Sequence, residues 1–169
     1  MPKSLADGHV KLTILTDEPA NPAAPTAVEL NAGIDFSCAV LASDFTFSAG
    51  DSDKVAERAL CDTNNKNALG ADNFTAGLTL FRMFDAVTGA VDETEDEAFQ
   101  AVKAKGTIVW GYVRENGKLA TANWATGDEI AVGMELLTDN PQRPSNAGGY
   151  VKRRVPLEPQ AGWTEIEAA

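Results

Sequence analysis

Apolar and polar residues alternate along three segments of the chain, residues 10–15, 34–41 and 74–84. In the second segment, IDFSCAVL, every second residue from Ile34 to Val40 is apolar or a cysteine, and the residues between them are small or polar. A two-residue period places successive side chains on opposite faces of a strand. We therefore predict a half-buried strand in each segment, with 74–84 as a long central strand.

Composition and turn signals indicate further strands. Residues 107–115, TIVWGYVRE, are β-branched and aromatic, and the Asn116-Gly117 pair after them is typical of a hairpin turn. A returning strand is therefore expected at 118–122. Additional strands are predicted at 129–138, 150–157 and 163–167, and residues 54–60 give a weak strand signal.

One segment predicts a helix, over about residues 94–105. Thr94 followed by Glu97 is a capping-box pattern, and Phe99 and Val102 share one helix face. Five of the six residues 92–97 are acidic. Because the helix dipole favours acids at its N-terminus, we interpret them as a solvated first turn and not as a metal or acid/base site.

These elements predict a mainly β fold. Eight or nine strands without crossover helices between them favour an antiparallel β-sandwich or barrel with one flanking α-helix. The 169 residues are close to the usual size of one domain, so we predict a single domain over 1–169.

Two long segments show no strand period. Residues 17–27, DEPANPAAPTA, contain three prolines and are predicted to be either a linker or an extended arm that reaches a neighbouring subunit. Residues 48–73 are mostly polar and glycine-containing, and their central part, CDTNNKNALGADN, is a run of loop formers.

The charge of the chain disfavours nucleic-acid binding. Twenty-five acids and fourteen bases give a formal net charge of -11, which repels a phosphate backbone. No stretch approaches the roughly 18 apolar residues of a membrane span, and the first residues lack the apolar core of a signal peptide. We therefore expect a soluble protein that is made in the cytoplasm and does not bind membranes.

The sequence offers little for catalysis. Its only histidine, His9, lies near the start of the chain, and no nucleophile elbow, zinc-protease motif, Walker loop or dinucleotide-binding turn is present. Pairs of acids will occur by chance among twenty-five. We therefore predict no enzyme activity, no cofactor and no metal site.

Two small groups of residues each leave two readings open. Cys38 and Cys61 are either small buried apolar groups or a disulfide between neighbouring strands. Within the basic run 152–154, Lys152 and Arg154 would share one strand face. They form either a solvated edge that discourages strand pairing or a patch that docks on the acidic surface of another copy.

The order of these segments resembles that of the major tail tube proteins of siphophages that infect actinobacteria. The resemblance covers the chain from about residue 28 to its end, and it rests on order and spacing instead of any one motif. After the proline-rich stretch, the segments are AGIDFSCAVL at 32–41, the polar excursion ending near 59–61, FTAGLTLFRMFD at 74–85, TEDEAFQAVKAKGT at 94–107 and LTDNPQ at 137–142.

The resemblance implies a structural virion protein located in the phage tail. Members form hexameric rings whose sheets join into an inner barrel, and the rings stack into a tube assembled in the host cytoplasm. The tube forms around the tape measure protein, contacts the tail terminator and distal tail proteins, and conducts DNA into the host cell without binding it specifically.

The resemblance also implies which segments contact other subunits. The N-terminal arm would be about residues 1–31, and the C-terminal residues 160–169 would assist. The inter-ring loop would be about 48–73, with Asp51, Asp53, Asn64, Asn65, Lys66, Asn67 and Asp72 as its contact residues.

Two other functions remain open on the sequence alone. One is a tail terminator or another ring-forming tail protein, which would cap the tube instead of extending it. The other is a monomeric acidic β-sandwich that binds carbohydrate through exposed aromatic side chains. Its candidates are Trp110, Tyr112, Trp124 and Trp163, although we expect them in the core or in an interface.

Overall fold

The computed structural model describes residues 5–145 and 148–169, and its main feature is one antiparallel seven-stranded sheet. The strand order is β2-β1-β7-β8-β9-β6-β3, and β4 and β5 form a separate two-stranded ladder. The prediction of a mainly β, antiparallel fold is confirmed. In chain order the elements are β1 (Val10–Leu15), α1 (Ala27–Ala32), β2 (Ile34–Asp35), the 3-10 turn η1 (Ala42–Asp44), β3 (Thr46–Ala49), β4 (Lys54–Val55), β5 (Ala68–Leu69), β6 (Phe74–Phe81), α2 (Glu97–Val102), β7 (Ile108–Glu115), β8 (Glu129–Thr138) and β9 (Lys152–Glu167).

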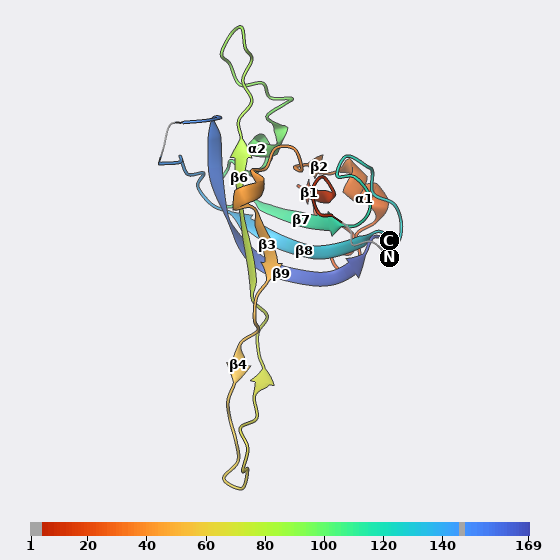
Figure 1. Cartoon of the computed structure of the whole chain (residues 1–169), viewed down its shortest axis with the longest axis vertical. Helices are drawn as coiled ribbons and strands as arrows, with labels where there is room; N and C mark the ends of the chain where they lie inside the picture. The colour runs from red at the N-terminus through yellow and green to blue at the C-terminus, as the bar shows by residue number, and fades with distance from the viewer. Residues whose placement is uncertain (1–4, 146–147) are drawn as a thin grey trace.

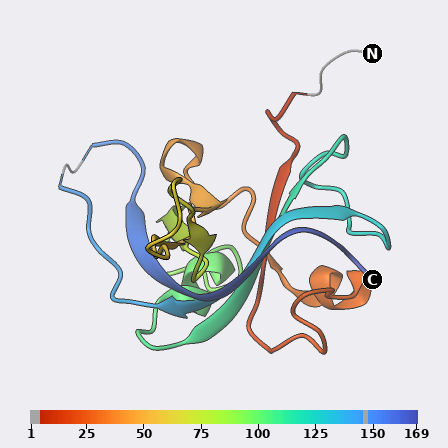
Figure 2. The ribbon, with the colours of Figure 1, turned by 90° about the horizontal axis from the view of Figure 1, so that it is seen from below.

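The long strand β9 folds the sheet into two layers. Its first half pairs with β6 up to Leu157, and from Leu157 onward it pairs with β8. The two predicted strands at 150–157 and 163–167 are therefore one continuous strand. Seen along the hairpin that carries β4 and β5, β3 and β6 lie on one side of the curved sheet and α1 on the other (Figure 2).

The main core lies between the two layers. Gly111 shows how closely they pack, because a Cβ there would lie 2.8 Å from the Phe47 ring on β3. Burying each aliphatic side chain contributes roughly 1.5–3 kcal/mol relative to exposure, so this core is the main source of stability. Its fully or nearly fully buried members include Leu12, Ile14, Phe36, Leu78, Leu80, Val109, Met134, Leu136 and Val155.

A second core covers the opposite face of β1 and β7. Leu30 of α1 packs there with Trp110, Tyr112 and Trp124. The sequence did not predict α1. Its N-terminus is a capping box, in which the Thr26 hydroxyl accepts from the Glu29 N–H and the Glu29 carboxylate accepts from the Thr26 N–H.

The predicted helix over 94–105 is shorter than expected, and its start differs. It begins at Glu97 after Asp96, so Thr94 does not cap it. Asp96 is only 1% exposed and binds Arg82, with 2.9 Å between Nη2 and Oδ2. The interpretation of 92–97 as a wholly solvated turn is therefore wrong at Asp96, although the adjacent acids except Asp92 are exposed.

The segment predicted as a strand over 34–41 leaves the sheet after Asp35. The Asp35 carboxylate accepts from the N–H and the hydroxyl of Ser37, which turns the chain. Phe36 is buried as expected, but Cys38 is exposed on the turn. The predicted return strand at 118–122 is also absent from the described sheet, because these residues form turns around Arg114.

The proline-rich segment lies against the chain's own sheet. The Tyr112 hydroxyl donates to the Pro22 carbonyl at 3.0 Å, and the Ala169 N–H donates to the Pro25 carbonyl at 2.9 Å. The expected arm over 1–31 also contains β1 in the sheet and most of α1. Residues 1–4 lie outside the described residues.

Candidate assembly surfaces

The most prominent surface feature is a long hairpin formed by residues 50–73. It continues β3 and β6 beyond the body of the protein and carries β4 and β5 (Figure 1). These two short strands pair only through Lys54 with Leu69 and Val55 with Ala68. Apart from Asp62, residues 53–70 are all exposed, so the hairpin has no core of its own. We call residues 50–73 the projecting hairpin.

Acids and an asparagine hold the base of the projecting hairpin. The side-chain amide of Asn73 donates to the Asp51 carbonyl at 2.9 Å and to the Asp53 carboxylate at 3.0 Å. The Ser52 hydroxyl donates to the Asp72 carboxylate at 3.0 Å. The sequence-predicted contact residues Asp51, Asp53 and Asp72 therefore contribute hydrogen bonds within the hairpin itself.

The other predicted contact residues lie farther out. Asn64, Asn65 and Asn67 are exposed, and Lys66 forms an exposed ion pair with Asp62 at 3.3 Å. The structure thus places all seven predicted residues on one projection. Sequence reasoning missed the apolar side chains of the same projection, namely Val55, Leu60 and Leu69, which are 47%, 110% and 76% exposed.

The two cysteines lie on different parts of the molecule. Cys38 is on the turn after β2, and Cys61 is on the projecting hairpin. Both are free and exposed, so neither reading from the sequence holds within this chain: they are not buried, and they do not form an intrachain disulfide. The physical reason is that the hairpin carries Cys61 away from the sheet (Figure 1).

The basic run on β9 is not at a free edge. On one side, Arg154 pairs with Thr79 of β6. On the other side, its backbone N–H and carbonyl form hydrogen bonds with the backbone of Gln142. Lys152 and Arg154 lie on the strand face opposite that of Arg153, and Arg154 is exposed. Of the two readings, the solvated edge is therefore wrong.

The second half of β9 does have an unpaired side. Within residues 5–145 and 148–169, the strand beyond Leu157 pairs only with β8, because β6 begins where the projecting hairpin ends. At the end of the sheet, β3 has β6 as its single partner among the described strands. Unpaired N–H and carbonyl groups along a strand edge are ready to pair with another chain.

Four exposed carboxylates on β8 and β9, those of Glu129, Glu158, Glu165 and Glu167, have no salt-bridge partner in the described part of the chain. The hydrogen bond with the Glu165 carboxyl group and its charge raise the pKa of Glu129. The exposed parts of β8 and β9 therefore retain uncompensated negative charge.

The aromatic candidates for sugar binding are mostly inside the protein. Tyr112, Trp110 and Trp124 belong to the second core, and Trp163 is half-buried on β9. The Trp124 indole donates to the Thr13 hydroxyl at 2.9 Å. A row of exposed aromatic platforms is therefore not formed by these four side chains.

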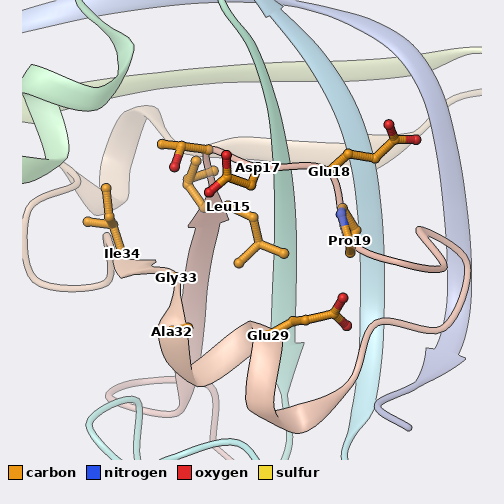
Figure 3. Close-up of a pocket in the computed structure, with 10 residues that line it drawn as sticks. Leu15, Asp17, Glu18, Pro19, Glu29, Ala32, Gly33 and Ile34 are labelled. Atoms are coloured by element: carbon orange, nitrogen blue, oxygen red, sulfur yellow. The ribbon is translucent and has the colours of Figure 1, made fainter.

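A hollow between α1 and the start of the proline-rich segment contains three acids (Figure 3). Its volume is about 210 Å³, and Asp17, Glu18 and Glu29 line it. Backbone hydrogen bonds from Ala20 and Thr26 lower the pKa of Glu29. Over residues 5–145 and 148–169, no group of three or more His, Cys, Asp or Glu side chains could hold a metal ion.

His9 also has a structural environment. Its Nδ1 lies 3.1 Å from the Lys118 carbonyl, within hydrogen-bonding distance.

Among the described residues, no helix is long and apolar enough to span a membrane.

A comparison with protein families gives a match over the whole chain. The model described as "Phage tail tube protein" matches residues 1–169. No curated protein matches the chain.

Proposed function

The chain belongs to the phage tail tube protein family, and from this membership we propose that it forms hexameric rings that stack into the tail tube of a siphophage. As a member of this family it is a structural component of the virion tail and not an enzyme. Stacking would occur around the tape measure protein during assembly in the host cytoplasm. The finished tube would conduct DNA into the host cell.

The projecting hairpin is the observation that carries this proposal. It is exposed along its length, it has no core, and its base is stiffened by Asn73 and Ser52. Binding to another subunit would break few contacts within the chain, because the side chains of the hairpin have few contacts to lose. We propose that it is the inter-ring loop, with the seven polar residues predicted from the sequence at its base and along its length.

Open strand edges support lateral assembly into a ring. The free side of β9 beyond Leu157 and the free side of β3 are aggregation liabilities in a monomer. In a closed ring, six such β9 edges could pair with six β3 edges of neighbouring copies. This pairing would leave the second core and α1 unchanged, because they cover a face of the sheet and not one of its edges.

Charge supports the conduction of DNA. The net charge of -11 and the unpaired carboxylates on β8 and β9 would repel DNA from a surface that lines the passage. The Lys152 and Arg154 side chains would serve a different purpose, as a basic patch that docks on an acidic surface of another copy.

The N-terminal segment and residues 160–169 are proposed to assist at subunit contacts. The tail terminator and distal tail proteins would bind the ends of the tube.

Electron microscopy of the purified full chain tests the proposal. We expect tubes or stacked rings at raised concentration, or after addition of the tape measure and initiator proteins. Single rings that never stack would instead indicate a tail terminator. A chain that stays monomeric even with those partners would contradict the proposal and favour a binding module.

A further inference from the structure

An apolar groove lies beside β1, away from the projecting hairpin of the same chain. Its volume is about 410 Å³. Val10 and Leu12 of β1 form one wall, and Val40 and Phe45 form another. Residues 6–8 and 120–121 close its ends, and the exposed Cys38 lies at its rim.

The projecting hairpin carries apolar side chains that have nothing to pack on. Leu60 is fully exposed near the tip, and Leu69 is 76% exposed. Transferring a leucine side chain from water to an apolar site is favourable by roughly 1.5–3 kcal/mol. An apolar groove on another molecule therefore suits Leu60 as an anchor.

The hairpin cannot reach the groove of its own chain. It continues β3 and β6 in a direct line away from the body (Figure 1). From Gly50 to Cys61 it would extend roughly 35 Å at about 3.3 Å per residue, so its tip is far from the sheet. A hairpin that docks in this groove must therefore belong to a second copy.

Charges around the two surfaces are complementary. Asp7 lines the groove, and Asp44 is exposed between two lining residues, Ala42 and Phe45. At the hairpin tip, Asp62 is paired with Lys66, and Arg58 has no salt bridge among those of the described chain. The charges of residues 57–66 cancel, because Glu57 offsets Arg58, but Arg58 and Lys66 line one hollow of the tip that no acid lines. This basic side of the tip complements the acidic rim of the groove.

We infer that the hairpin tip of one copy docks in the groove of a second copy, with Leu60 in the groove and Arg58 near Asp7. The inference rests on the proposed stacking of rings, and it names the receptor surface for the hairpin. The contact is head-to-tail, because hairpin and groove are different surfaces of the chain, and such contacts propagate along a stack. Docking also brings Cys61, which follows Leu60, close to Cys38 of the other copy.

Oxidative cross-linking tests this contact with the cysteines that the chain already has. Tubes of the full chain are treated with copper phenanthroline in air. Two thiols then form a disulfide, and their two electrons and two protons pass to dioxygen. A disulfide requires Cα atoms within about 7 Å, so only a close contact is trapped. We expect a ladder of covalent multimers on a non-reducing gel.

Single-cysteine variants distinguish this contact from others. Cys38→Ser and Cys61→Ser should each abolish cross-linking, and an assembled mixture of the two should give dimers only. Dimers formed by either variant alone would overturn the inference, since they show contact between like cysteines. Tubes seen by microscopy without a ladder would overturn the inference and leave the proposed function intact. Absence of both tubes and cross-links would overturn both.

A charged residue at the anchor provides a second test. Leu60→Asp should raise the concentration needed for tube formation at least tenfold and remove the ladder, while circular dichroism stays unchanged. Val87→Asp is the matched control, because Val87 is 94% exposed on the loop between β6 and α2. Equal effects of the two variants, or loss of assembly in Val87→Asp alone, would overturn the inference, because neither result fits a specific contact by the hairpin tip.

Discussion

The guanidinium of Arg114 and the carboxylate of Asp128 form a buried ion pair, with 3.2 Å between Nη1 and Oδ2. Arg114 is completely buried, and it also donates to the carbonyls of Leu119, Ala122 and Asn123. One side chain on β7 therefore fixes the loop that leads to β8. This loop, through residues 120–121, also closes the apolar groove.

Replacing Arg114 with leucine should destabilise the protein by about 3–5 kcal/mol, because Asp128 and three carbonyls would lose a buried partner. Urea unfolding followed by tryptophan fluorescence measures the change in free energy. Lys105→Ala is the control, since Lys105 pairs with Asp139 at 3.6 Å on the surface and its loss should cost about 0–1 kcal/mol. Equal losses in the two variants would contradict a special role for the buried pair.

Acid should destabilise the fold through Asp96. Burial by itself raises the pKa of Asp96, but hydrogen bonds from Arg82, the Met83 N–H and Gln100 outweigh it and lower the pKa below its usual value. The unfolded chain then binds more protons than the folded one, so stability is present above about pH 4 and is lost as the pH falls.

The urea midpoint at several pH values between about 3 and 7 checks this dependence. Asp96→Asn should be less stable than the parent at neutral pH and should lose less on acidification. An unchanged slope in the variant would show that other carboxyls control the acid response. Asp128 is the main alternative, because Lys118 and Arg114 also lower its pKa against the effect of burial.

Thr26→Ala should cost about 1 kcal/mol, because it removes the side-chain cap of α1. The natural control is Thr94→Ala, since Thr94 has the same sequence pattern and its side chain caps no helix. Thermal unfolding should show a lower melting temperature for the first variant only. A larger loss at Thr94 would contradict the assignment of the capping box.

Thr26 and Thr94 show how far the sequence could predict the fold, because both begin a T-x-x-E pattern and only Thr26 caps a helix. The period of 74–84 predicted a strand whose apolar residues face the core, and Leu78 and Leu80 are buried there, although Thr79 on the opposite face is buried as well. The period of 34–41 misled, because the Asp35 side chain forms a local turn that competes with the ladder. The T-x-x-E pattern of α1 was present in the sequence, within a segment that its prolines mark as irregular.

The candidate surfaces divide in the same way. The hairpin was predictable as a polar excursion, since loop-forming residues act locally. The groove was not, because it combines residues 6–12, 37–45 and 120–121, which only tertiary packing brings together. The exposure of Leu60 could not be predicted either. The sequence Ala59-Leu60-Cys61 is the same whether the leucine side chain is buried or exposed.

Gly111→Ala should destabilise the packing between the two layers by about 1–3 kcal/mol. The added Cβ would lie 2.8 Å from the Phe47 ring and 3.0 Å from Ile14 Cδ1, so a core side chain must move. Gly77→Ala on β6 is the matched control, because a Cβ there meets nothing within 4 Å. Urea midpoints compare the two, and a loss in the control as large as at Gly111 would refute the close contact.

Deleting residues 64–71 should block tube formation and leave the body folded. The deletion removes β5 and the exposed Leu69, and so the hairpin can no longer pair Lys54 with Leu69. The body should survive because residues 64–70 are exposed and belong to neither core. Electron microscopy reports assembly, and the melting temperature of the monomer reports the fold. An unfolded variant would mean that the hairpin supports the sheet, whereas a folded variant that still forms tubes would exclude the hairpin as the inter-ring loop.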